Sequence, residues 1–228
     1  MSTRQIPKDS RMDRRNPVQD DRICQVRVGM IFEKEGTGFF IGPDTILTSA
    51  HTVMGASKAR IKVASGKTYR GIVRVNPNYT DENADSDFAL IKLRKKVAKG
   101  FFELSPFPTG ESLCLDMAGF PCDRKGLWGQ TIVARGTYED KAFACAFSQP
   151  GMSGGPCSYG NTVYGLIKGV MGEHSDDIFI VNGMNVTRVT GFMLTFLVHE
   201  MSTFVVKKTL TEQVKNSVLR WVDGRRSC

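Results

Sequence analysis

Short β-type runs, each followed by turn residues, repeat along most of this 228-residue chain. Glycine, proline, asparagine and aspartate separate the runs at intervals of about 8 to 15 residues, and no long helical periodicity interrupts them. Regular short strands with such turn residues favour an all-β barrel or sandwich. In the first part of the chain the runs are Cys24–Val28, Gly38–Ile41, Thr45–Thr48, Arg60–Val63 and Gly71–Val75.

A basic, proline-containing stretch after these runs is the best candidate for a domain boundary. It comprises Arg94–Gly100 and Ser105–Gly110, and a second set of predicted strands follows it. We therefore expect one β domain over residues 23–104 and a second over residues 105–228. The second set of runs is Ser112–Ala118, Thr131–Thr137, Lys141–Phe147, Thr162–Val170, Ile178–Val181 and Asn185–Val189.

The two ends of the chain differ from its strand-rich middle. Residues 1–22 alternate acidic and basic side chains with almost no apolar content, which predicts a disordered polar tail. Residues 209–222 carry apolar side chains at helical spacing, and Gly224 follows them as a stop signal. We expect a C-terminal α-helix over about residues 209–222.

Composition bears on location and partners. The longest near-continuous apolar stretch, Phe192–Val198, is far short of the roughly 20 residues needed to cross a bilayer, so no membrane span is predicted. The first twenty residues hold no apolar segment of the secretory type, which favours a cytoplasmic or viral, host-intracellular location over secretion. The net charge of +8 fits an anionic partner but is also common among soluble enzymes.

The cysteines show no metal-binding spacing, because no CxxC or Cys/His cluster occurs. We therefore expect no metal and no cofactor. We interpret the cysteines as reduced and mostly buried thiols, since a disulfide framework requires a secreted context. The six are Cys24, Cys114, Cys122, Cys145, Cys157 and Cys228.

Three short segments carry residues suited to nucleophilic catalysis. His51 follows a β run, Asp87 directly precedes an apolar strand, and Ser153 lies in the segment Gly-Met-Ser-Gly-Gly-Pro. A serine nucleophile needs a base to take its proton and an acid to hold that base in the right tautomer. The order His, Asp, Ser over two strand sets predicts such a triad. Asp85 is nearby, but only Asp87 leads directly into the strand.

The glycines around Ser153 suit the stabilisation of a developing oxyanion. That charge needs backbone N–H groups aimed at one point. Gly151 lets the backbone twist so that its own N–H and that of Ser153 point to one spot. We therefore expect Gly151 and Ser153 to form an oxyanion hole.

These segments resemble the core motifs of trypsin-like serine proteases, which have the chymotrypsin fold. The resemblance covers roughly residues 24 to 200 and implies two antiparallel six-stranded β-barrels with the active site in the cleft between them. It implies a serine endopeptidase that acts on polypeptides through an acyl-enzyme, with His51 as base, Asp87 as orienting acid and Ser153 as nucleophile. The motifs are Gly36-Thr-Gly-Phe-Phe-Ile, Thr48-Ser-Ala-His, Asp87-Phe-Ala-Leu-Ile-Lys-Leu and Gly151-Met-Ser-Gly-Gly-Pro.

Two branches of that family are the most similar. Gly119-Phe-Pro-Cys-Asp123 is similar to a stretch of the bacterial glutamyl endopeptidases, and viral chymotrypsin-like proteases also often lack the secretion signal. Met152 stands where zymogen-type members carry an acid, so an inserted N-terminal ammonium would lack its counter-ion. We therefore predict that no N-terminal processing is needed, and that a chain beginning near Arg22 is as active as the full chain.

The resemblance also suggests which residues line the specificity pocket. They are Phe147, Ser148 and the strand that contains Lys168. No aspartate stands at the Phe147 position, which argues against a preference for Arg or Lys. If Lys168 points into the pocket, its ammonium can pair with a substrate carboxylate. The alternative is an apolar pocket with Lys168 in solvent.

Two other functions remain alternatives to proteolysis. The chain could be a catalytically silent protease homologue that binds protein, although such homologues usually lose a triad member. It could also bind nucleic acid, alone or in addition to proteolysis. That second alternative rests on basic residues near the domain boundary and the C-terminus: Lys92, Arg94, Lys95, Lys96, Lys99, Arg220, Arg225 and Arg226.

Overall fold

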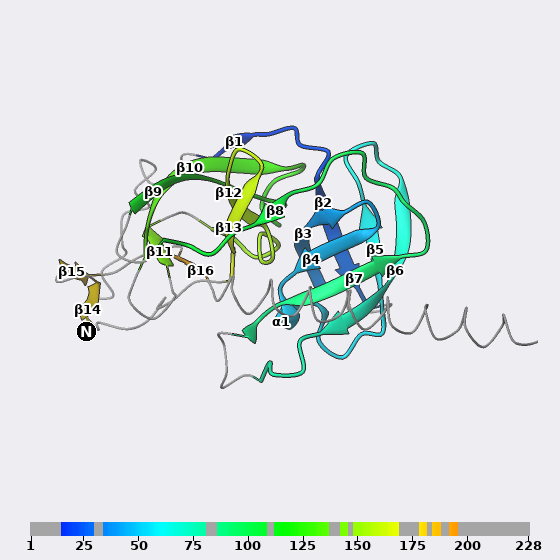
Figure 1. The fold of residues 1–228 in the computed structure, drawn as a ribbon, viewed down its shortest axis with the longest axis horizontal. Helices are drawn as coiled ribbons and strands as arrows, with labels where there is room; N and C mark the ends of the chain where they lie inside the picture. Colours follow the sequence, from blue (N-terminus) through cyan, green and yellow to red (C-terminus); the bar gives the residue numbers. More distant parts are fainter. Residues whose placement is uncertain are drawn as a thin grey trace, which may run out of the picture.

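The computed structural model describes the residues that form the strand-rich body of the chain. These residues are 15–29, 34–80, 86–108, 112–136, 142–145, 148–168 and three later strands at 178–181, 184–187 and 192–195. The expected all-β, chymotrypsin-like fold is confirmed, with a closed barrel and a second sheet side by side (Figure 1). The C-terminal helix expected over residues 209–222 lies outside the described residues.

The first barrel closes through six antiparallel strands in the order β2-β3-β4-β7-β6-β5. Alternate side chains point inward, as on β2, where Cys24, Val26 and Val28 are buried while Gln25 and Arg27 are partly exposed. The inward positions form one apolar core, which holds the barrel together. The strands are β2 Ile23–Val28, β3 Lys34–Gly42, β4 Thr45–Thr48, β5 Lys58–Lys62, β6 Thr68–Val75 and β7 Ala89–Leu93.

The second sheet contains eight strands, two more than expected for each barrel. The additional strands are short edge pieces: β1 pairs with the start of β10, and β8 runs parallel to β13. A separate hairpin is formed by β14 Ile178–Val181 and β15 Met184–Thr187. The sheet consists of β1 Asn16–Pro17, β8 Glu103–Leu104, β9 Ser112–Gly119, β10 Trp128–Gly136, β11 Ala142–Cys145, β12 Pro156–Tyr159, β13 Thr162–Leu166 and β16 Phe192–Thr195.

The ends of the first domain differ from the sequence expectation. Residues 15–22, expected to be part of a disordered tail, pack on the protein: β1 pairs with β10, and the Arg15 side chain is fully buried. Arg15 pairs with Asp123 and Arg22 donates to Asn161, both far away in the sequence, and composition alone does not reveal these contacts. β8, expected in the first domain, pairs with β13 of the second sheet. We therefore propose a domain boundary between Leu93 and Glu103.

An apolar layer joins the two halves of the molecule. Phe39 and Phe102 meet edge to face, with ring centres 5.6 Å apart. Buried side chains from both halves surround this pair, so the barrels share one core cluster and keep a defined relative position. The cluster is Ile23, Phe39, Leu47, Phe88, Leu90, Phe102, Ala118, Leu127, Val163 and Leu166.

Candidate active site

His51 and Asp87 are brought together by the pairing of β4 with β7. Thr48 lies opposite Ala89 in this antiparallel pair, so His51 and Asp87 both extend beyond the same end. His51 sits in α1 Ala50–Val53, a single helical turn after β4. The register therefore explains how two residues far apart in sequence come to share one site.

The Asp87 carboxylate holds the His51 imidazole with one oxygen and the His51 backbone with the other. His51 Nδ1 lies 2.7 Å from Asp87 Oδ2, and the His51 backbone N–H donates to Asp87 Oδ1 at 2.8 Å. The Asp87 side chain is only 4% exposed, whereas that of His51 is 37% exposed. Because an ionised carboxylate can only accept hydrogen bonds, Nδ1 carries the hydrogen and Nε2 is left to accept a proton.

The turn Gln149–Met152 precedes Ser153 and has the geometry of a type II turn. Met152 N–H donates to the Gln149 carbonyl at 3.0 Å, Pro150 takes the first central position, and Gly151 has a φ of 91°. We call this segment, residues 149–152, the oxyanion turn, after the role that the sequence analysis expects for Gly151. Only glycine adopts that φ without strain, so the sequence Pro-Gly determines the local shape.

Two N–H groups of this region are left without an internal acceptor. Those of Met152, Gly154 and Gly155 donate to carbonyls at 2.7 to 3.0 Å. Among the residues that the structure describes, the N–H groups of Gly151 and Ser153 have no such acceptor. These two donors, on residues separated by one position, are free to bind an anionic oxygen.

Gly154 brings residues 153–155, which we call the serine loop, into close contact with residues 48–53, which we call the histidine turn. A Cβ on Gly154 would lie 2.3 Å from the Thr37 carbonyl oxygen and 2.7 Å from the Ser49 backbone nitrogen. Its φ of 82° also favours glycine. The backbone after Ser153 therefore lies directly against the residues that precede His51.

The Ser153 hydroxyl is turned toward Lys168 rather than toward His51. Ser153 Oγ lies 3.5 Å from the Lys168 carbonyl oxygen, and the described contacts of Ser153 include no hydrogen bond to His51. A 3.5 Å contact is weak, so rotation about the Cα–Cβ bond of Ser153 costs little. A hydrogen bond between a serine nucleophile and its histidine base is often long or unformed before substrate binds.

Thr37 on β3 connects the two barrels at this point and was missed by our sequence analysis. It is fully buried, and its hydroxyl donates to the Gly151 carbonyl at 2.8 Å and accepts from Phe120 N–H at 2.9 Å. Its backbone N–H donates to the Ser153 carbonyl at 2.8 Å. The only sequence signal was a hydroxyl residue between two glycines in the first motif, Gly36-Thr-Gly.

Met152 is buried in an apolar cluster. It is 0% exposed and packs with residues that include Met117 and Ile167. A Cβ on Gly119 would lie 2.9 Å from Met152 Cα, so the start of the 119–123 segment touches the turn directly. Neutral packing therefore surrounds the residue before Ser153.

The expected specificity residues are only partly described. Phe147 lies outside the described residues. Ser148 is buried at 7% exposure, and Lys168 is partly buried with its carbonyl beside Ser153. Tyr164, on the strand leading to Lys168, packs edge to face against Phe107 at 6.1 Å.

Four cysteines, Cys24, Cys114, Cys122 and Cys157, are free thiols. Burial raises the pKa of the Cys24 and Cys157 thiols far above the ordinary range. Cys114 and Cys122 are exposed, so the expectation of mostly buried thiols holds for two of these four. In the part of the chain that the structure describes, no group of three or more His, Cys, Asp or Glu residues is placed to hold a metal ion.

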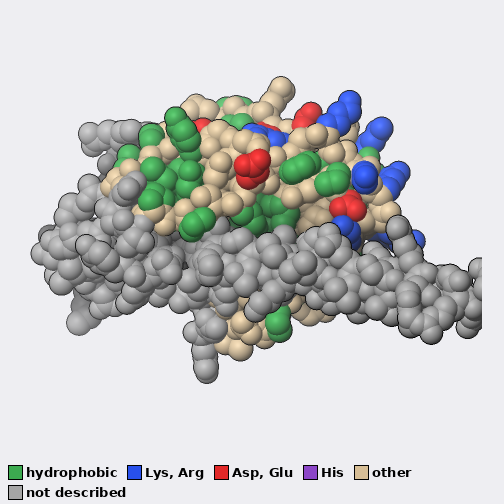
Figure 2. All heavy atoms as spheres, viewed as in Figure 1, with side chains coloured by type: hydrophobic (Ala, Val, Ile, Leu, Met, Phe, Trp, Pro, Cys, Tyr) green, Lys and Arg blue, Asp and Glu red, His purple; other side chains and the backbone are tan. Residues whose placement is uncertain are grey.

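Basic side chains gather at the end of the molecule occupied by the first barrel (Figure 2). Lys92 is paired with Asp44 at 2.8 Å, and Lys95 lies 5.4 Å from the centre of the Tyr69 ring. Burial raises the pKa of the Asp44 carboxyl, but hydrogen bonds from Lys92 and Thr45 outweigh it and lower the pKa overall.

Within the described residues, no helix has the length and apolar character needed to cross a membrane.

Comparisons with known proteins place this geometry in context. The profile of the family described as trypsin-like peptidase domain matches residues 36–165. The crystal structure of the inactive form of the Rv3671c protease is similar, with a TM-score of 0.51, 22% identity and coverage of 66% of this chain and 79% of that chain. The active form, from M. tuberculosis, has a TM-score of 0.54, 23% identity and coverage of 77% and 76%. No curated protein sequence matches.

Proposed function

This chain belongs to the trypsin-like peptidase family, and from that membership we propose that it is a serine endopeptidase acting through His51, Asp87 and Ser153. The observation that carries the proposal is the 2.7 Å contact between His51 Nδ1 and Asp87 Oδ2, which aims His51 Nε2 away from the acid. The close packing of the serine loop on the histidine turn supports it.

In the proposed first half-reaction, Ser153 Oγ rotates toward His51 and attacks the carbonyl carbon of the peptide bond. Nε2 takes the hydroxyl proton, and Asp87 stabilises the imidazolium that forms. The carbonyl oxygen becomes an oxyanion that accepts hydrogen bonds from the N–H groups of Gly151 and Ser153. His51 then gives its proton to the leaving amine, the C–N bond breaks, and an acyl-Ser153 ester remains.

In the second half-reaction, water replaces the amine. His51 takes a proton from this water, whose oxygen attacks the ester carbonyl. The same two N–H groups hold the second oxyanion. Collapse breaks the ester bond, His51 returns the proton to Ser153 Oγ, and the carboxylic acid product leaves. The proposed reaction consumes one water molecule, returns the proton to Ser153 and requires no cofactor.

The test compares covalent labelling of the parent chain and of Ser153→Ala by a fluorophosphonate probe, which reacts only with an activated serine. We expect the parent to gain the probe mass at Ser153 and the variant to gain none. Peptide hydrolysis should fall by several orders of magnitude in Ser153→Ala and His51→Ala, because the triad acts as a unit. Ser158→Ala, a buried serine on β12, is the matched control and should label like the parent.

Two outcomes would contradict the proposal. Hydrolysis by Ser153→Ala at the parent rate would exclude a serine mechanism. A folded parent that neither labels nor hydrolyses peptides would favour the silent homologue.

Substrate preference follows from the same site. We propose that Phe147, Ser148 and Lys168 line the specificity pocket, with either an acidic preference through Lys168 or a preference for apolar residues.

A further inference from the structure

The chain immediately before the first barrel forms a strap across the second sheet. We call residues 15–22 the N-terminal strap. Val18 N–H donates to the Leu127 carbonyl at 3.0 Å, beside the pairing of β1 with β10. At the other end, the Arg22 carbonyl accepts from Phe40 N–H at 2.8 Å. The strap is therefore attached to both halves of the molecule.

An ion pair between Arg15 and Asp123 joins the strap to the residues after β9. The Arg15 guanidinium donates through both terminal nitrogens to the two carboxylate oxygens, at 3.2 and 3.0 Å. The Arg15 side chain is 0% exposed, and that of Asp123 is 40% exposed. A buried guanidinium is costly unless its donors are paired, so this two-bond contact fixes the position of Asp123 relative to the strap.

Asp123 belongs to the segment that supports the oxyanion turn. We call residues 119–127 the support loop. Its Cys122 N–H donates to the Pro150 carbonyl at 2.8 Å, and a Cβ on Gly151 would lie 2.4 Å from the Phe120 carbonyl oxygen. There is no free space between the loop and the turn at these points. A displacement of the support loop therefore moves the N–H groups of the oxyanion turn.

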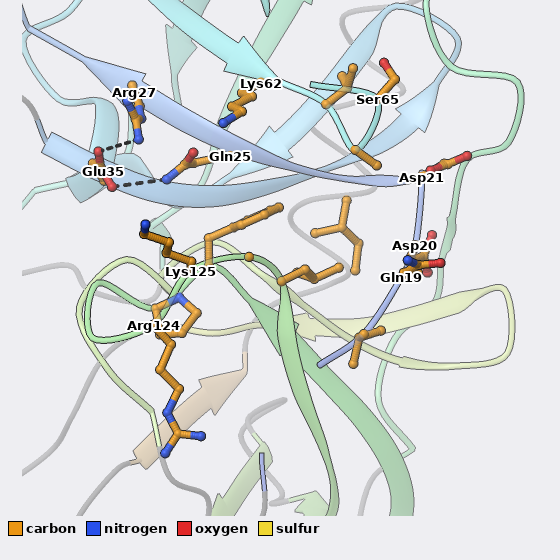
Figure 3. Close-up of a pocket in the computed structure, with 18 of the residues that line it drawn as sticks. Gln19, Asp20, Asp21, Gln25, Arg27, Glu35, Lys62, Ser65, Arg124 and Lys125 are labelled. Carbon is orange, nitrogen blue, oxygen red and sulfur yellow. Dashed lines mark hydrogen bonds and ion pairs between the residues drawn. The ribbon is translucent and has the colours of Figure 1, made fainter. Parts of the chain in front are cut away.

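On its other side the support loop borders a groove rather than a packed core (Figure 3). The groove has a volume of about 780 Å³ and is lined by strap residues 18–21, by residues of the first barrel and by loop residues 120–122 and 124–127. Arg124 and Lys125 reach from the loop on one side, while Gln19 and Asp20 of the strap lie across the groove. Because the support loop is not packed on the groove side, contacts on its remaining sides, such as the Arg15–Asp123 ion pair, carry more of its positioning.

We propose that the N-terminal strap is an intramolecular activating element, in which Arg15 is a positioning residue that holds the oxyanion turn through Asp123 and the support loop. This inference rests on the proposed function. It also replaces the expectation that a chain beginning near Arg22 is fully active, because such a chain lacks Arg15. Neutral packing around Met152 orders one side of the turn, and the strap orders the other.

The experiment measures kcat, KM and the rate of fluorophosphonate labelling for variants of the full chain, at a temperature where circular dichroism shows each to be folded. The variants are Arg15→Gln, Asp123→Asn, the double variant and Arg15→Lys. Lys125→Gln is the matched control, because it removes a positive charge from the same loop, and the Lys125 side chain forms no hydrogen bond or ion pair among the described residues.

We expect Arg15→Gln and Asp123→Asn each to lower kcat about tenfold, less than the 100-fold or more that follows complete loss of an oxyanion donor. KM should change little, the double variant should be no worse than either single variant, and Lys125→Gln should match the parent. Arg15→Lys should be intermediate, since one ammonium cannot form two parallel bonds. If Arg15→Gln does not fold, Asp123→Asn decides, because its side chain is partly exposed.

Any one of three results would overturn the inference. Asp123→Asn could keep the parent kcat, Lys125→Gln could lose as much kcat as the strap variants, or the losses in kcat could add in the double variant. These results are distinguishable from failure of the proposed function. If the parent labels at Ser153 and the strap variants label at the same rate, only the role of the strap is wrong. If the parent does not label at all, both proposals are wrong.

Discussion

Replacing Thr37 with valine removes one hydroxyl while nearly preserving side-chain volume. That hydroxyl donates to the Gly151 carbonyl at 2.8 Å and accepts from Phe120 N–H at 2.9 Å. Thr37 is 0% exposed, so water cannot easily replace the lost partner. The substitution therefore leaves one acceptor and one donor of the oxyanion-turn region without their hydrogen bonds.

The magnitude follows from these two groups. Each buried polar group left unpaired costs about 1–3 kcal/mol, so we expect a loss of roughly 2–4 kcal/mol in the free energy of unfolding after partial relaxation. Gly151 is also one of the two proposed oxyanion donors. Loss of one such donor costs about 100- to 1000-fold in kcat, and a misplaced donor should cost about 10- to 100-fold.

The assay pairs urea unfolding with steady-state hydrolysis for Thr37→Val, Thr37→Ser and Thr52→Val. Thr37→Ser keeps the hydroxyl and should recover most of kcat, losing about 1 kcal/mol of stability with the methyl group. Thr52 is 3% exposed, and its hydroxyl bonds to Ser49 rather than to the oxyanion turn. Thr52→Val should therefore keep kcat within about threefold of the parent. The reasoning is refuted if folded Thr37→Val retains parent kcat, or if Thr37→Ser is no better than Thr37→Val.

The hydrogen bond from Arg15, together with its charge, outweighs burial and holds the pKa of the Asp123 carboxyl below its usual range. A lowered pKa means that the folded protein binds fewer protons, so the stabilisation is present at neutral pH and is lost as the pH falls through the folded-state pKa. Urea midpoints of the parent and Asp123→Asn should therefore differ at pH 7 and converge below about pH 4; a constant difference would contradict this. For specificity, Lys168→Glu should lower cleavage after acidic residues if Lys168 lines the pocket. A peptide library that shows no acidic preference in the parent would instead establish the apolar pocket.

Local sequence patterns were sufficient to predict the strand-rich fold, and the sequence also encodes the turn before Ser153. Alternation on β2 and turn residues between strands are properties of neighbouring residues, so they can be read directly. The pair Pro150-Gly151 likewise encodes its own turn, because Gly151 supplies the positive φ that the second central position requires. His51 and Asp87 could be selected because each lies beside a strand end, and the β4–β7 register accounts for their contact.

The support around the site was decided by tertiary structure alone. Thr37 bonds to a residue 114 positions away, and Arg15 to one 108 positions away. Neither partner leaves a periodicity or a local motif, and the charged composition of residues 15–22 is the same for a solvated tail as for a strap. What distinguishes them is the burial of Arg15 against Asp123, which exists only after β1 has paired with β10. The proposed catalytic side chains could be selected from local sequence. The contacts that hold them in place depend on the first barrel and the second sheet meeting along an apolar layer, which no single segment contains.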